Sequence, residues 1–177
     1  MKNRVVGTLC AFFLSVSFAH AEKPAIITGA GPGGGPHVIG RLYDIALTNP
    51  FASFFAYDQG FRGGVEVAAC DLDGDNIDEL ITGAGPGAGP HVIAFSGAAL
   101  KQGRYVPLHS FFAFAPSFTG GVHVACGDFN GDHRGDIVVG AGSGGGPHVR
   151  VVSGVDLREL ASFYAYETAF TGGVNVA

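Results

Sequence analysis

The chain has 177 residues, and its 15 acidic side chains outnumber its 10 basic ones, giving a formal net charge of −5 at pH 7. Nucleic-acid binding depends on a basic surface that neutralises phosphates, so this charge balance argues against DNA or RNA as a partner.

The first 21 residues differ in composition from the rest of the chain. Lys2 and Arg4 precede an apolar run, Val5–Phe18, and Ala19-His20-Ala21 is a small-x-small cleavage pattern. The pattern is typical of a Sec signal peptide and predicts that residues 22–177 are secreted, either to the extracellular space or to the periplasm. A membrane anchor is disfavoured because the run is shorter than the roughly 20 residues that span a bilayer. Without the leader, the net charge becomes −7.

The remaining residues, 22–177, repeat one phrase three times. Gly-Ala-Gly-x-Gly-x-Gly-Pro-His-Val occupies residues 29–38, 83–92 and 140–149, so successive copies are 54 and 57 residues apart. A period of this length indicates a repeat architecture rather than one catalytic fold.

One repeat unit contains four short runs with strand character. The runs are Val65–Ala69, Glu79–Thr82, His91–Phe95 and Phe111–Phe114. Clusters of Gly, Pro or Asp lie at their ends. Four strands without an amphipathic helix predict an all-β fold, the four-stranded blade of a β-propeller, with an all-β solenoid as the competing architecture. About three blades are expected, fewer than the roughly four to eight of closed rings, so the ring is partial or is completed by oligomerisation.

The repeats begin and end out of phase with the blades. The pattern starts at a second strand, Ala25–Thr28, and finishes at a first strand, Val174–Ala177. Either the propeller is C-terminally incomplete and further blades are missing, or three-blade chains pair as a homodimer into a six-blade ring. The sequence favours the first arrangement, because the pattern stops where a third acidic loop is due.

The glycine-rich phrase also matches a cofactor fingerprint. Gly29-x-Gly31-x-x-Gly34 has the spacing of a dinucleotide-binding loop, which requires a helix to begin at once. Here Pro36-His37-Val38 begins a strand instead. The sequence therefore predicts tight turns, and no nucleotide.

Two nine-residue acidic loops, 71–79 and 128–136, place oxygen-bearing side chains at positions 1, 3, 5 and 9. The expected side-chain ligands are Asp71, Asp73, Asp75 and Glu79 in the first loop and Asp128, Asn130, Asp132 and Asp136 in the second, with the backbone carbonyls of Ile77 and Arg134 at position 7. An all-oxygen set in a tight loop favours Ca²⁺. At position 6, Asn76 and His133 are residues that tolerate the left-handed region.

Three other interpretations of these loops are weaker. An EF-hand would need a glutamate at position 12, where Thr82 and Val139 stand, and would need flanking helices. Zinc would call for Cys or His ligands. A solvated acidic turn would leave five acids of the first loop repelling one another without compensation.

Cys70 and Cys126 each precede one acidic loop. A disulfide is permitted in an exported protein, and two separate buried side chains are the alternative. The sequence leaves this choice open because geometry decides it.

The two acidic loops and the Gly-Ala-Gly-Pro-Gly-x-Gly-Pro-His-Val phrase resemble the FG-GAP, or VCBS-like, repeats of bacterial secreted proteins, relatives of the integrin α-chain propeller. The resemblance covers essentially all of residues 24–177. It implies a β-propeller with calcium in the loop between the first two strands of a blade, held by the ligands named above. Glu79 departs from the usual aspartate, and the first unit has no such loop.

Ionisable residues that recur from unit to unit indicate structure rather than a catalytic centre. We expect His37, His91 and His148 to pack or to hydrogen-bond, and the Phe-Phe-Ala-Tyr segments to pack between blades. The sequence therefore predicts a non-enzymatic, calcium-binding module for adhesion or for interaction with a protein or glycan at a surface. The alternatives are a carbohydrate-binding lectin and the propeller part of a larger secreted hydrolase or lyase.

Overall fold

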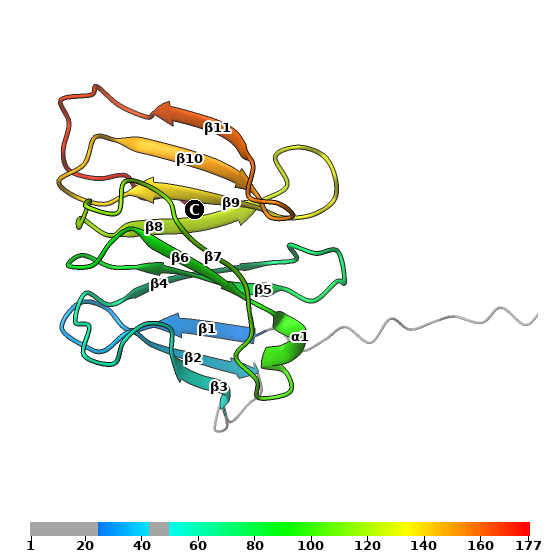
Figure 1. The fold of residues 1–177 in the computed structure, drawn as a ribbon. Helices are drawn as coiled ribbons and strands as arrows, with labels where there is room; N and C mark the ends of the chain where they lie inside the picture. Colours follow the sequence, from blue (N-terminus) through cyan, green and yellow to red (C-terminus); the bar gives the residue numbers. More distant parts are fainter. Residues whose placement is uncertain (1–24, 43–49) are drawn as a thin grey trace, which may run out of the picture.

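A computed structural model describes residues 25–42 and 50–177, so the predicted leader lies outside the described residues. The described chain forms three antiparallel sheets stacked on one another (Figure 1). Within every sheet, neighbouring strands are also consecutive in the sequence.

Each repeat contributes one sheet, the first of three strands and the other two of four strands each. The first sheet contains β1 (Ala25–Gly29), β2 (His37–Leu42) and β3 (Pro50–Phe55). The second contains β4 (Val65–Cys70), β5 (Glu79–Ala84), β6 (His91–Phe95) and β7 (Pro107–Phe112), with the short helix α1 (Gly97–Leu100) before β7. The third contains β8 (Val122–Gly127), β9 (Asp136–Ala141), β10 (His148–Ser153) and β11 (Glu159–Tyr164).

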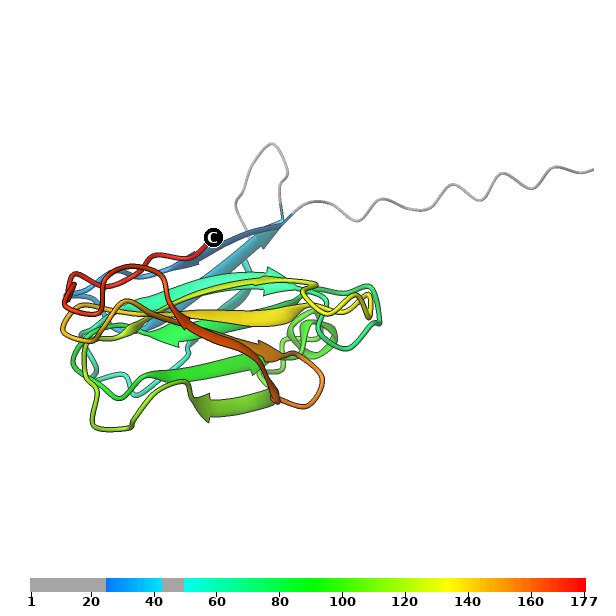
Figure 2. The same cartoon turned by 90° about the horizontal axis from the view of Figure 1, so that it is seen from above.

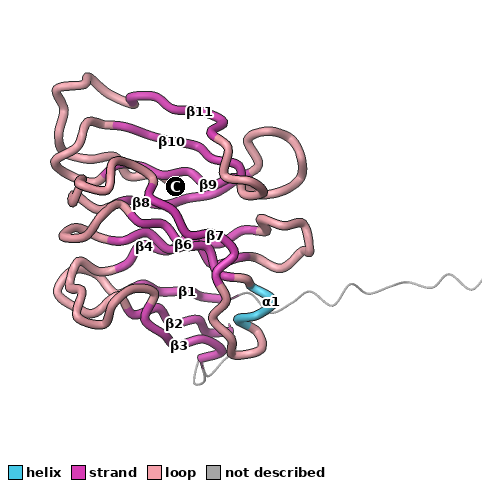
Figure 3. The backbone as a smooth tube through the Cα atoms, in the orientation of Figure 1, coloured by secondary structure: helices cyan, strands magenta, loops and turns pink. Residues whose placement is uncertain are grey.

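The arrangement of the sheets confirms the predicted fold class. Strand β4 contacts both β1 and β8, so the second sheet lies between the other two. In the view from above, the three sheets lie over one another, and the axes of their antiparallel strands are roughly aligned (Figure 2). Strands dominate the described chain, and one short helix interrupts them (Figure 3). The chain is an all-β, partial β-propeller, as the repeat pattern predicts.

Apolar side chains fill both spaces between the sheets. Between the first and second sheets, the buried cluster includes Val38, Phe54, Val65, Leu80 and Phe95. Between the second and third, it includes Leu72, Ile81, Val92, Val122, Ile137 and Val139. Every residue of β5 and of β9 is buried, because each of these strands has neighbours within its sheet and across both faces.

Close approach of the backbones explains two of the repeated glycines. A β-carbon at Gly29 would stand 2.2 Å from the carbonyl oxygen of Val65, and one at Gly140 would stand 2.3 Å from that of Val174. Any larger residue at Gly29 would push the first two sheets apart, and any larger residue at Gly140 would push the C-terminal segment away from the third sheet.

The strand predictions are right for the first three strands of the unit and wrong for the fourth. Strand β7 ends at Phe112, whereas a strand to Phe114 was expected. The reason is the pairing register: Phe112 lies opposite His91, where β6 begins, so the ladder stops there. The backbone amide of Ala113 then bonds the carbonyl of Pro90 instead.

Helix α1 was not predicted. It has only four residues, too few to show a helical period in the sequence. Its start is fixed locally, because the hydroxyl of Ser96 accepts the backbone N–H of Ala99 at 3.2 Å.

The strand predicted at residues 174–177 does not form. Val174 is buried and its N–H donates to the carbonyl of Ala141 at 2.9 Å. Val65 makes the same bond to Ala30 at 2.8 Å, and there β4 goes on to pair with β5. One backbone bond without such a ladder leaves residues 174–177 irregular.

The residues after Gly29 form a turn, and β2 begins at His37, where the sequence predicted a strand in place of the helix of a dinucleotide-binding loop. No helix within residues 25–42 and 50–177 is long and apolar enough to cross a membrane.

The three repeated histidines pack and hydrogen-bond, as expected. Each Nε2 atom lies within 3.0 Å of a serine hydroxyl on the neighbouring strand, in the pairs His37–Ser53, His91–Ser110 and His148–Ser162.

The aromatic segments follow the packing prediction only in part. Phe54 is 8% exposed, whereas Phe55 is 42% exposed and Phe112 is 49% exposed. Successive side chains of a strand point to opposite faces, which places the second phenylalanine of each pair outward.

Candidate metal centre

The two acidic loops occupy corresponding places in neighbouring sheets. Residues 71–79 join β4 to β5, and residues 128–136 join β8 to β9. Both loops project from the same end of the stack, on the right in Figure 1, while the glycine-rich turns lie at the opposite end.

The carboxylate at position 1 closes each loop. In the first loop, the two oxygens of Asp71 accept the backbone N–H groups of Gly74 and Asn76, at 2.6 and 2.8 Å. In the second, Asp128 accepts those of Gly131 and His133, at 2.6 and 2.9 Å. The two loops therefore share one fold.

The side chains at positions 3 and 5 each accept the backbone N–H two residues further on. Asp73 accepts from Asp75 at 3.1 Å, and Asp75 accepts from Ile77 at 2.8 Å. The second loop repeats this pattern: Asn130 accepts from Asp132 and Asp132 accepts from Arg134, each at 2.9 Å. A carboxylate oxygen has further lone pairs, so these bonds orient the side chains without exhausting them.

Position 6 has the predicted backbone conformation. Asn76 has φ of 63° and His133 has φ of 64°, both in the left-handed region. Asparagine and histidine are enriched there among non-glycine residues, which explains why glycine is not needed at this point.

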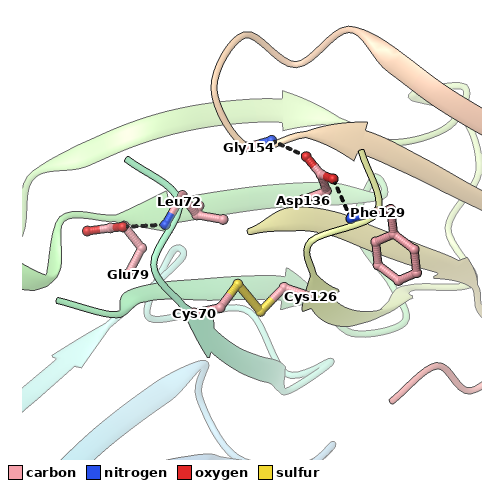
Figure 4. Close-up of a disulfide and its surroundings, with 7 residues drawn as sticks. All are labelled: Cys70, Leu72, Glu79, Cys126, Phe129, Asp136 and Gly154. Atoms are coloured by element: carbon pink, nitrogen blue, oxygen red, sulfur yellow. Dashed lines mark hydrogen bonds between the residues drawn. A yellow bond between two sulfur atoms is a disulfide. The ribbon is translucent and has the colours of Figure 1, made fainter. Parts of the chain in front are cut away.

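Position 9 has a role that the sequence did not reveal. Glu79 and Asp136 are fully buried. The carboxylate of Glu79 accepts the N–H groups of Leu72 and Gly97, at 2.8 and 3.2 Å. The carboxylate of Asp136 accepts those of Phe129 and Gly154, at 2.8 and 3.4 Å (Figure 4). Each carboxylate thus ties its loop to the connection between the third and fourth strands.

Electrostatics differ between the two loops. Burial raises the pKa of Glu79, and the negative charges of Asp73 and Asp75 raise it further, against the effect of its two backbone hydrogen bonds. Desolvation raises the pKa of Asp128, but hydrogen bonds from three backbone N–H groups and the interaction with His133 lower it by more. The net shift of this pKa is therefore downward. The carboxylates of the first loop therefore repel one another.

The structure brings three of the predicted ligands together. Carboxylate oxygens of Asp71, Asp73 and Glu79 all lie within 4.8 Å of one another. In the second loop, the amide nitrogen of Asn130 donates to Asp136 at 3.2 Å, so these two side chains also converge. Ligation through Asp75, Asp132 and the carbonyls of Ile77 and Arg134 stays a prediction.

The donor set of both loops fits a hard cation such as Ca²⁺. The converging side chains offer oxygen atoms, and the first loop concentrates like charges that a divalent ion would neutralise. The flanking elements are strands, so the EF-hand interpretation is wrong. Such an ion would supply no chemistry beyond charge neutralisation and loop cross-linking.

A disulfide joins the inner strands directly before the two loops. Cys70 and Cys126 are bonded, with 6.4 Å between their Cα atoms, which settles the choice that the sequence left open (Figure 4). Next to it, the N–H of Gly135 donates to the carbonyl of Asp71 at 2.6 Å. A β-carbon at Gly135 would stand 2.5 Å from the sulfur of Cys70, so the approach of the two loops requires glycine there.

The loops also meet through one basic side chain. The Nε atom of Arg134 lies 3.1 Å from the point where a β-carbon at Gly74 would stand. The second loop therefore covers part of the first, and the two candidate sites are direct neighbours.

Comparison with known families identifies the second loop and its surroundings. Residues 114–154 match the model of the FG-GAP repeat family. This span includes β8, the loop 128–136, β9 and β10. No curated protein matches the chain. The first loop lies outside the matched span but repeats the backbone bonds of the second. The chain thus carries an FG-GAP repeat at residues 114–154, within a β-propeller-like module.

Proposed function

We propose that this chain is an exported, calcium-stapled β-propeller module that serves adhesion or surface interaction and is not an enzyme. One observation supports it above all: two loops with the same internal hydrogen bonds present oxygen side chains at one end of neighbouring sheets. The leader-like residues 1–21 and the net negative charge agree with export and with a partner other than nucleic acid.

The ion would act as a staple. Extracellular calcium modules have dissociation constants of roughly 10⁻⁴ to 10⁻³ M. At about 1 mM calcium, each occupied loop then adds about 0.4 to 1.4 kcal/mol to the free energy of unfolding. A gain of this size stabilises the ends of the blades. The partner would bind the surface that the ordered loops form.

Thermal unfolding tests the calcium proposal. Chelation with EDTA should lower the melting temperature, and added calcium should restore it, while magnesium at equal concentration restores less because it prefers a rigid octahedral shell. The double variant D75N/D132N is the matched control, since an asparagine oxygen can still accept the backbone N–H of Ile77 or Arg134, so the variant keeps the loop geometry but weakens both sites. An unchanged melt in EDTA rejects the proposal.

Exposed aromatic rings beside polar side chains favour a lectin as the second candidate. Phe55, Phe112 and Tyr164 are each more than 40% exposed and lie next to a histidine–serine pair. Such rings stack on sugars. Retention on a glycan array, lost when Phe112 becomes alanine, would favour this candidate over a protein partner.

A further inference from the structure

A cavity of about 370 Å³ lies between the first and second sheets, at the end of the stack opposite the acidic loops. Its walls come from the connection between β3 and β4, the turn between β5 and β6, and the paired ends of β6 and β7: Tyr57, Asp58, Phe61, Ala84, Ala88, Gly89, His91 and Phe112. The volume falls in the range of small-molecule sites.

Four aromatic rings form a continuous wall of this cavity. Phe61 meets Tyr57 edge-on at 6.3 Å, Tyr57 lies 5.6 Å from His91, and His91 stacks on Phe112 at 4.9 Å. The hydroxyl of Tyr57 bonds Thr82 and the carbonyl of His91, so the centre of the wall is held in place. The wall is therefore formed before any ligand arrives.

Asp58 gives the cavity its charge. The lining residues include no Lys or Arg within the described chain. Burial lowers the pKa of His91 and raises that of Tyr57, so both are neutral at pH 7. One carboxylate beside an aromatic wall makes the cavity negative.

The next repeat separates the role of the rings from the role of the carboxylate. Phe114, Phe118, His148 and Tyr164 form the same chain of ring contacts between the second and third sheets, at 6.2, 5.1 and 4.9 Å. Ala115 stands there in place of Asp58.

One backbone hydrogen bond of the surrounding turn forms without a carboxylate. The bond from the N–H of Phe61 to the carbonyl of Asp58, 3.0 Å, recurs as 2.9 Å from Phe118 to Ala115. The carboxylate of Asp58 adds a bond of its own, because its Oδ1 atom accepts the backbone N–H of Gly60 at 2.7 Å. This bond orients the carboxylate, which has further lone pairs for a ligand.

We propose that this cavity binds a small organic cation of the methylated ammonium class, with the rings facing the methyl groups and Asp58 facing the charge. Cation–π contacts contribute about 0.5 to 2 kcal/mol each, depending on desolvation. A bare metal ion would need several oxygen ligands, and the cavity offers one carboxylate. The site is independent of the acidic loops and of any calcium in them.

The test compares choline with its uncharged isostere, 3,3-dimethylbutan-1-ol. Titrations of the purified chain are followed by calorimetry and NMR both in EDTA and in excess calcium, so that any attraction of choline to the acidic loops is recognised by its loss when calcium is present. Choline should bind with one equivalent, about tenfold more tightly than the isostere. Equal affinity for the two, or no binding of choline, overturns the proposal.

Variants assign the binding to this cavity. D58N should weaken choline binding about fivefold or more, and F112L should weaken it about fivefold, with melting temperatures measured in parallel to show that both variants are folded. The second wall has Ala115 and lies near the positive charge of Arg150, so it should contribute no equivalent. If D58N binds choline as the parent does, the carboxylate is not the recognition element and the proposal fails.

Discussion

The interface between the first and second sheets and that between the second and third follow one plan but differ in chemistry. At the first, the hydroxyl of Tyr57 lies 3.2 Å from that of Thr82 and donates to the carbonyl of His91 at 2.9 Å. At the corresponding point of the second, the chain has Phe114 and Val139. Both sides of the contact change together, so a buried polar atom never loses its partner.

A second difference lies near the acidic loops. The second interface carries the disulfide between Cys70 and Cys126 and the backbone bond from Gly135 to Asp71. The sequence of the first unit has no counterpart of the acidic loop. The interfaces thus share their close glycine contacts but differ in the side chains that join the sheets: a tyrosine hydroxyl at the first and a disulfide at the second.

Removing the disulfide should have the largest effect and should act on the second interface. The two cysteines are 56 residues apart, and closing a loop of that length stabilises by about 4 kcal/mol in the chain-entropy description. The double variant C70A/C126A should lose about this much free energy of unfolding in denaturant titration.

Reduction of the parent chain provides the control, because it breaks the bond without removing either side chain. Equal stability of parent and variant under oxidising conditions would show that the bond contributes nothing.

Exchanging the two interface pairs should have the next largest effect. Y57F leaves carbonyl groups of the first interface without a donor, and F114Y places a hydroxyl against Val139; each should cost about 1 to 3 kcal/mol. The variant F114Y/V139T rebuilds the polar pair at the second interface and should recover most of the loss.

A double-mutant cycle on Phe114 and Val139 measures that coupling directly. Additive losses in the cycle would mean that the two residues of a pair contribute independently to stability. The Tyr57–Thr82 and Phe114–Val139 pairs would then not be coupled units of the two interfaces.

Calcium should affect the two loops unequally, by about 1 kcal/mol or less each. The first loop has four acidic ligands and the second has three, so we expect the first to release its ion last as EDTA is added. D75N should therefore reduce the calcium-dependent rise in melting temperature more than D132N does, since both variants keep the oxygen that accepts the backbone N–H two residues further on. The reverse order would place the stronger site in the matched FG-GAP span.

Local signals explain what the sequence predicted well. Glycine and proline turns mark the strand ends, so β4, β5 and β6 are found within two residues of their expected limits. The left-handed conformations of Asn76 and His133 follow from residue type alone. Loop closure by Asp71 and Asp128 follows from spacing, because it needs only residues five or fewer positions apart.

Contacts between distant residues explain what the sequence missed. The end of β7 depends on where β6 begins, and the bond from Glu79 to Gly97 spans 18 residues. Tyr57 lies in the connection between β3 and β4, whereas Thr82 lies in β5, 25 residues further on. Aligning the repeats shows that Phe114 and Val139 replace Tyr57 and Thr82. That the two replacements are coupled follows only once the structure shows that these positions are in contact.

Acid should produce the smallest effect, and salt should separate the two interfaces. Burial lowers the pKa of His91, beside Tyr57, and of His148, beside Phe114. Because an unfolded histidine titrates near about 6.5, this contribution to stability is complete above that pH and is lost as the pH falls below it toward the folded pKa. H91Q and H148Q should each flatten the fall in stability between about pH 7 and 5.

The positive charge of Arg150 also lowers the pKa of His148, against a smaller opposing effect of Glu159, whereas burial is the cause at His91. Salt screens the repulsion from Arg150 but leaves burial unchanged. Urea unfolding at about 1 M salt should therefore shrink the effect of H148Q and preserve that of H91Q. Equal salt sensitivity at both positions would mean that the two histidines share one environment, and that the interfaces differ only at the Tyr57–Thr82 pair.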